Sequence, residues 1–132
     1  MDFNLTEEHL MIREAARDFA QTELLPGVIE RDEKQFFPKE LVKKMGDLGF
    51  LGVMVDPKYG GSGMDTISYV IIMEELSKID ASASVIVSVN NSLVCYGLEK
   101  YGSVDQKEKY LTKLATGEFV GAFCLSEPEA GS

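Results

Sequence analysis

The stretch that most constrains the fold is residues 83–102, ASVIVSVNNSLVCYGLEKYG. Its first half is apolar on nearly every side of a helix, so a helix here has to be surrounded by other elements. The β-branched run VIVSV alone could also form a strand, but the length of the stretch and its pattern up to Tyr101 favour a helix. We therefore expect a helix buried in the middle of a bundle, with Ser82 or Ser84 as its N-cap.

Further helices are predicted by capping residues at both ends of amphipathic segments. Thr6 is suited to cap the first segment, and Ser103 with Gln106 forms a capping box. Gly49 and Gly117 fit the ends of two others. The expected helices are 7–24, 28–35, 38–48, 66–80, 83–102 and 104–115, with a glycine-rich loop over 48–65. The fold class is therefore all-α, a bundle of about six helices.

Bulk composition excludes several classes of protein. The 132 residues are 45% hydrophobic and 27% charged, which is typical of one globular domain. The net charge of −9 argues against a nucleic-acid partner and against binding to anionic membranes. No uninterrupted apolar run approaches the ~20 residues of a membrane span, and the N-terminus does not resemble a targeting peptide. We expect a cytoplasmic protein.

The residue types that bind metals are sparse. Cys95 and Cys124 lie 29 positions apart without a CxxC motif, and His9 is the single histidine. This pattern predicts no metal site and two buried, reduced thiols. His9 lies beside two glutamates near a helix start, where a solvated histidine is expected rather than a catalytic one.

Three further motifs have a structural and a functional interpretation. Glu74 and Glu75 are adjacent, so they cannot share one helix face as an acid/base pair, and we expect an exposed rim and a salt-bridge partner. GGSG at 60–63 lacks the lysine of a phosphate-binding loop, which favours an ordinary turn. Asn90 and Asn91, inside an apolar helix, either tie the helix to a neighbouring loop or lie close to a ligand.

The last residues differ in character from the rest. Residues 119–125, FVGAFCL, have the pattern of a strand, and no partner strand is visible in the sequence. An unpaired apolar strand suggests a β domain downstream. In SEPEAGS, residues 126–132, small residues and hydroxyl groups follow a proline-stiffened turn, where a flat or phosphorylated ligand could approach the backbone closely.

Residues 123–132, FCLSEPEAGS, resemble the signature of the acyl-CoA dehydrogenases, flavoenzymes that desaturate acyl-CoA thioesters. The resemblance extends over essentially the whole chain. KYGGSGMD is similar to a glycine-rich loop of the family, EELSKIDAS to its EELs-x-x-DAS segment, and YGSVDQKEKYLTKLATGE to the stretch before its middle domain. LTEEHLMIREAARDFAQTELLP resembles the family's first helix.

The resemblance implies a domain organisation. Residues 1–118 would form the N-terminal helical domain, and residues 119–132 the start of the middle β domain, with the middle and C-terminal domains absent from this chain. The catalytic glutamate of the family lies in the C-terminal domain, so no catalytic residue is expected here. Glu127, beside Pro128, is expected to be a structural hydrogen-bonding residue. The family also implies a homotetramer.

The resemblance also implies binding residues. FAD is the expected cofactor, with SVNNSL at 88–93 as in the short-chain (butyryl-CoA) branch. The expected FAD-binding residues are Phe123, Cys124, Leu125, Ser126, Gly131 and Ser132. The expected substrate-binding residues are Val85, Ile86, Val89 and Leu93, which can share a helical stripe, together with Ser132.

The implied function is the flavin-dependent α,β-dehydrogenation of a short-chain acyl-CoA to the trans-2-enoyl-CoA in fatty acid β-oxidation. Electrons would pass to electron-transferring flavoprotein. Two alternatives remain open. One is an acyl-CoA oxidase or another flavoenzyme on the same scaffold, and the other is a helical module that binds a partner helix or peptide in an apolar groove.

Overall fold

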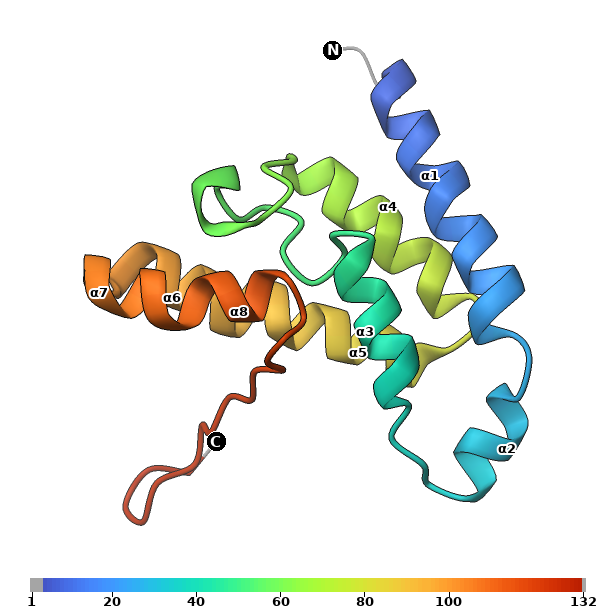
Figure 1. Ribbon diagram of the computed structural model, residues 1–132. Coiled ribbons are helices and arrows are strands. Elements are labelled where there is room, and N and C mark those ends of the chain that lie inside the picture. Colours follow the sequence, from blue (N-terminus) through green and yellow to red (C-terminus); the bar gives the residue numbers. More distant parts are fainter. Residues whose placement is uncertain (1–3, 132) are drawn as a thin grey trace.

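The computed structural model describes residues 4–131, and in this range the chain forms six continuous helices and one short 3₁₀ turn (Figure 1). Three of the helices contain a π-helical segment, labelled η here, in which the hydrogen bonds span five residues. The elements are α1 Glu7–Phe19 with η1 Ala20–Leu24, α2 Val28–Glu33, α3 Lys39–Asp47, η2 Pro57–Tyr59, α4 Thr66–Ser77, α5 Ala81–Ser88 with η3 Val89–Cys95 and α6 Tyr96–Tyr101, and α7 Val104–Gln106 with η4 Lys107–Leu111 and α8 Thr112–Ala115.

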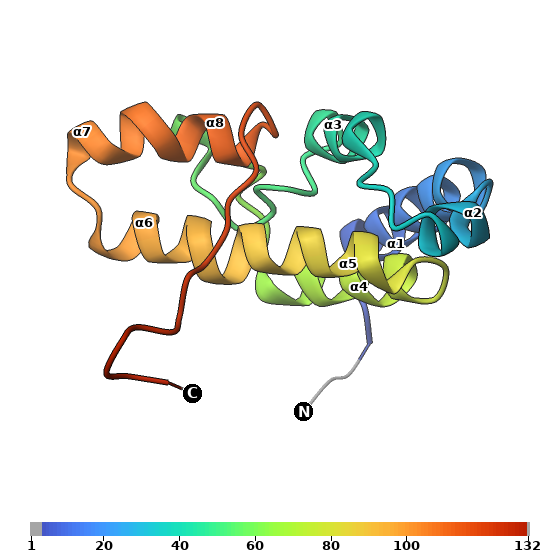
Figure 2. The same cartoon turned by 90° about the horizontal axis from the view of Figure 1, so that it is seen from below.

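Two apolar clusters hold the helices together. The larger one joins α1, α3, α4 and α5 and includes Leu24, Met45 and Leu76, each fully buried. The smaller one packs α8 against η3 through Cys95, Leu111 and neighbours. Figure 2 shows α5 and α6 running along the length of the molecule, with α7 and α8 returning beside their C-terminal half. The all-α bundle of about six helices is thus confirmed.

The glycine-rich loop between α3 and α4 is held tightly. A Cβ on Gly52 would lie 2.7 Å from the Cβ of Ala115, so the loop approaches α8 as closely as a backbone can. Gly49 has a positive φ of 77° and ends α3, as expected. GGSG is an ordinary turn between Val55 and α4 that returns toward residues 52–55 through backbone hydrogen bonds.

The N-cap of α5 differs from the prediction. Asp80, not Ser82 or Ser84, caps the helix, and its carboxylate accepts a hydrogen bond from the backbone N–H of Ala83 at 3.0 Å. Ser84 is instead buried against α4, where its hydroxyl lies 2.7 Å from that of Ser77. The predicted caps at Thr6 and at Ser103 with Gln106 are both present.

The helix Ala81–Tyr101 is only partly surrounded. Its 21 residues are long and apolar enough, by length and composition, to cross a membrane, which the sequence had not led us to expect. One face is buried in the bundle through Ala83, Val87 and Cys95, whereas the opposite face is exposed. The expectation of a helix buried on all sides was therefore wrong, because apolar composition does not show what covers each face.

Residues 118–131 leave the bundle without forming a strand. The tail crosses α5–η3 and then runs away from the helices (Figure 2). In the described residues, the predicted strand 119–125 has no partner strand, and the single β-bridge joins Glu127 to Ala130 within a turn. A strand requires hydrogen bonds to a second strand, so the apolar pattern alone leaves this segment extended and unpaired.

Candidate functional site

Three of the four residues expected to contact an acyl chain lie on the uncovered face of α5 and η3. Val85 is 58% exposed and Leu93 is 44% exposed, and Val89 between them is half-buried. Their spacing of four residues places them on successive turns. Ile86 instead packs against the larger core cluster and, with Phe36, lines a hollow beside α2. The structure therefore exposes the stripe at Val85 and Leu93, and Ile86 at its edge also contacts the core.

Asn91 fixes the back of this helix to the glycine-rich loop. Its side-chain N–H groups donate to the carbonyl oxygens of Phe50 at 2.8 Å and Val87 at 2.9 Å. Its Oδ1 accepts the backbone N–H of Val53 at 2.8 Å. The structural interpretation of this residue, a tie to a neighbouring loop, is confirmed.

Asn90 is fully buried and joins three segments of the chain. Its Nδ2 donates to the carbonyl oxygens of Leu51 at 2.7 Å and Leu114 at 3.0 Å. Its Oδ1 accepts the backbone N–H of Gly121 at 2.9 Å. The last bond attaches the tail to the helix that carries the apolar stripe.

The tail presents hydrogen-bond donors that are free within the described chain. Between Gly121 and Glu127, no acceptor in the described residues meets the backbone N–H groups of residues 122–126 or the hydroxyl of Ser126. Phe123 and Leu125 are more than half exposed. An edge with free N–H donors fits the acceptor atoms of an isoalloxazine ring, which are the points where a protein tunes a flavin.

The remaining tail residues lie in and after a turn. The backbones of Glu127 and Ala130 exchange two hydrogen bonds, at 2.9 Å and 3.2 Å, which agrees with a structural position for Glu127. A Cβ on Gly131 would meet no atom within 4 Å, so this position is open. Ser132, expected to contact both FAD and substrate, lies outside the described residues.

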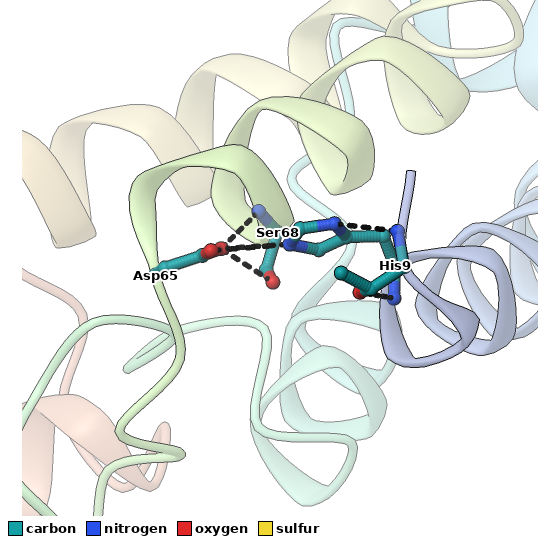
Figure 3. Close-up of polar contacts among 4 residues, drawn as sticks. His9, Asp65 and Ser68 are labelled. Carbon is teal, nitrogen blue, oxygen red and sulfur yellow. Dashed lines mark hydrogen bonds and ion pairs between the residues drawn. The ribbon is translucent and has the colours of Figure 1, made fainter. Parts of the chain in front are cut away.

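His9 is buried rather than solvated, contrary to the prediction. Its Nδ1 accepts the backbone N–H of Thr6 at 3.3 Å, and its Nε2 lies 3.1 Å from the carboxylate of Asp65 (Figure 3). Asp65 in turn caps α4 and accepts from the backbone N–H and hydroxyl of Ser68, both at 2.8 Å. These hydrogen bonds, first those from Ser68 and then that from His9, lower the pKa of Asp65 to about 2.

This cluster is a structural tie and not a catalytic triad. Ser68 donates to Asp65 and makes no hydrogen bond to His9, so the serine–histidine contact of a triad is missing, and the buried Ser68 hydroxyl is not accessible to a substrate. The cluster joins the start of α1 to the start of α4. No sequence signal could have paired residues 9 and 65 across 56 positions.

Both glutamates make salt bridges, as expected, but Glu75 is buried and is not part of an exposed rim. Glu74 is exposed and pairs with Lys78 at 3.2 Å. Glu75 is buried and accepts two hydrogen bonds from the guanidinium of Arg17, at 3.0 Å and 3.1 Å. These bonds, followed by that from Lys78, hold the pKa of Glu75 down at about 2.

The two cysteines differ. Cys95 is fully buried, and burial raises the pKa of its thiol to about 12. Cys124 is exposed in the tail, so the prediction of two buried thiols was wrong for this residue. Across residues 4–131, no three His, Cys, Asp or Glu side chains gather closely enough to hold a metal ion.

Comparison with known proteins identifies the family of this helical domain. The family described as "Acyl-CoA dehydrogenase, N-terminal domain" matches residues 6–118. This chain belongs to the acyl-CoA dehydrogenase family. The match ends at residue 118, three residues after the end of α8 and one residue before the segment that was predicted as a strand.

Individual relatives agree in sequence and in structure. The short-chain-specific acyl-CoA dehydrogenase of Clostridium acetobutylicum is 46% identical over 132 residues, which is 100% of this chain and 35% of that protein. The structure of butyryl-CoA dehydrogenase from Megasphaera elsdenii superposes with a TM-score of 0.92 at 42% identity, over 99% of this chain and 35% of that one. The chain thus spans about a third of the length of these acyl-CoA dehydrogenases.

A third relative is named for a different activity. The 3-(aryl)acrylate reductase of Clostridium sporogenes is 46% identical over 127 residues, covering 96% of this chain and 34% of that protein. The helical domain of the family therefore occurs, at equal identity, in a protein named for reduction of a double bond. Similarity over this domain therefore shows the family, but it does not distinguish an acyl-CoA dehydrogenase from an acrylate reductase.

Proposed function

We propose that this chain is the N-terminal part of an enzyme that dehydrogenates a short-chain acyl-CoA between Cα and Cβ. The product would be the trans-2-enoyl-CoA. The observation that carries the proposal is the meeting of two features at Asn90, namely an uncovered apolar stripe on one helix and a tail of free backbone donors. The sequence similarity to short-chain relatives supports the same substrate class.

The stripe of Val85, Val89 and Leu93 would form one wall of the acyl pocket. Its apolar surface favours a hydrocarbon chain and excludes water from the reacting carbons. Ile86, packed against the core from the same helix, would support the wall from behind. Two half-exposed side chains at its ends leave room for a second wall supplied by another part of the enzyme.

The tail would hold FAD. The backbone N–H groups of residues 122–126 and the Ser126 hydroxyl would donate to the ring, with Phe123 to Leu125 lying along it. Gly131, where a side chain would meet nothing, and Ser132 would lie toward the phosphates. When bound, FAD supplies the acceptor for the hydride that leaves Cβ, while a base outside this chain takes the proton from Cα.

Electrons would then pass to electron-transferring flavoprotein. We propose a cytoplasmic homotetramer as the working form.

The test is a steady-state assay of the longer protein, that is, the enzyme of which this chain would be the N-terminal part. The assay supplies butyryl-CoA and electron-transferring flavoprotein. We expect butyryl-CoA-dependent reduction of the acceptor and a product two hydrogens lighter by mass spectrometry. Absence of turnover with every acyl-CoA of four to eight carbons would contradict the proposal.

A second candidate is the reverse reaction, reduction of a 2-enoate or its thioester. The specific observation in its favour is the 46% identity to an acrylate reductase. The two are separated by supplying the enzyme with a reduced electron donor and an aryl acrylate or its thioester. Faster turnover in that direction than with butyryl-CoA would favour the reductase.

A further inference from the structure

Asn90 holds the tail at one point of the wall helix, and its amide orientation is fixed by its partners. Both of its Nδ2 hydrogens meet carbonyl oxygens, those of Leu51 and Leu114, and Oδ1 meets the N–H of Gly121. Turning the amide over would place an N–H against an N–H and an oxygen against two carbonyl oxygens. Because the side chain is 0% exposed, water cannot replace any of these partners.

The tail is closely packed against the helix Ala81–Tyr101 at this point. A Cβ on Gly121 would lie 2.7 Å from Cγ1 of Val94, which is four residues after Asn90 on the same helix. The backbone of Gly121 therefore lies directly on the helix, and its N–H reaches the amide of Asn90. Outside this contact, the N–H groups of residues 122–126 have no partner in the described chain. The register of the tail is thus set at Gly121, two residues before Phe123.

We propose that Asn90 is a positioning residue that sets the flavin segment in register with the acyl wall. Its neighbour in sequence, Val89, is the centre of the apolar stripe, and its hydrogen-bond partner, Gly121, begins the segment that would hold the ring. One buried amide would therefore set the distance between the wall that contacts the acyl chain and the tail that contacts the flavin. The proposal rests on the function proposed above, and it assigns to Asn90 a role beyond stabilising the bundle.

Asn91 provides a matched control. It is the next residue and is also buried, and its amide, like that of Asn90, makes two hydrogen bonds to carbonyl oxygens and one to a backbone N–H, without the additional contact of Asn90 Nδ2 to Cys95 Sγ at 3.6 Å. All three, however, end within residues 50–53 and the helix itself. Replacing either asparagine by alanine removes several side-chain hydrogen bonds from the same helix, but only Asn90→Ala removes the bond that holds the tail.

The experiment uses the longer, flavin-loaded protein and compares wild type, Asn90→Ala and Asn91→Ala. Both variants should unfold at lower temperature. Only Asn90→Ala should also weaken FAD binding, by roughly three- to tenfold for one lost hydrogen bond, and change the visible spectrum of the bound flavin. The inference is overturned if Asn91→Ala weakens FAD binding as much, or if neither variant does. Wild type without flavin would instead overturn the proposed function.

A second measurement needs no variant and guards against one that fails to fold. Amide hydrogen exchange on the 132-residue chain should show the Gly121 N–H protected while those of residues 122–126 exchange rapidly. Equal, rapid exchange of all six amides would show that Asn90 does not hold the tail.

Discussion

The buried carboxylate of Glu75 gives the sharpest test of how the first and fourth helices are joined. The change is Glu75→Gln, which keeps the size of the side chain and removes its charge. In the structure the side chain is 4% exposed, and Arg17 donates to both of its oxygens while Lys78 lies 2.9 Å from Oε1. The variant leaves these cations beside a neutral amide.

The expected cost follows from the pKa. The Arg17 hydrogen bonds lower the pKa of Glu75 from 4.5 to about 2, so the ionised form is favoured by about 3 kcal/mol in the folded state. This figure is an upper bound, because the side chains of Arg17 and Lys78 are 54% and 51% exposed and water screens their attraction to the carboxylate. We therefore expect Glu75→Gln to lower the free energy of unfolding by roughly 1–3 kcal/mol at pH 7.

The sign of the pH dependence is also fixed. The folded pKa lies below the unfolded one, so the contribution of Glu75 is fully present above pH 4.5 and is lost as the pH falls from 4.5 toward about 2. The difference between wild type and Glu75→Gln should therefore shrink between pH 7 and pH 3. Glu74→Gln, at an exposed position that pairs with the exposed Lys78, should cost less than ~0.5 kcal/mol at both pH values.

The assay is urea unfolding of the 132-residue chain followed by far-UV circular dichroism, at pH 7 and pH 3. Two results would refute the reasoning. One is a cost for Glu75→Gln no larger than for Glu74→Gln. The other is a cost that stays constant between the two pH values.

Two further substitutions test the packing and the wall. Gly52→Ala would place a Cβ 2.7 Å from the Cβ of Ala115 and should lower the stability measured by thermal unfolding by ~1–3 kcal/mol. In the control Gly97→Ala, a Cβ meets nothing within 4 Å, so this change should be neutral or stabilising. Equal effects of the two changes would contradict the packing. In the longer enzyme, Val89→Ala should shift the preference in kcat/KM toward longer acyl-CoAs by at most ~1–3 kcal/mol. Val87→Ala, at a buried position of the same helix, is the control and should leave this preference unchanged. An unchanged chain-length profile for Val89→Ala would remove Val89 from the pocket.

Local signals predicted the helices well because caps and breakers act within a few residues. Thr6, Ser103 and Gly117 each lie where the sequence placed them. The errors have two causes. His9 is buried because Asp65, 56 positions away, meets its ring. The cap of α5 was assigned wrongly at short range, because the helix begins at Ala81 and so contains Ser82 and Ser84, whereas Asp80 directly precedes it.

In the candidate site, too, the local features could be predicted and the features that depend on tertiary contacts could not. The apolar stripe is visible in the spacing of Val85, Val89 and Leu93, since helical periodicity is a local property. The exposure of its face, and the bond from Gly121 to Asn90 across 31 positions, depend on how separate segments meet. Residues 119–125 meet no partner strand among residues 4–131, so the pattern predicted a tendency and not a structure.

The most direct test of the account is the visible absorption of the longer protein while butyryl-CoA is added without oxygen. The account predicts a flavin spectrum that bleaches as substrate is added, because the wall helix and the tail together place the acyl chain against the ring. A protein that carries no flavin, or a flavin that no acyl-CoA bleaches, would contradict it.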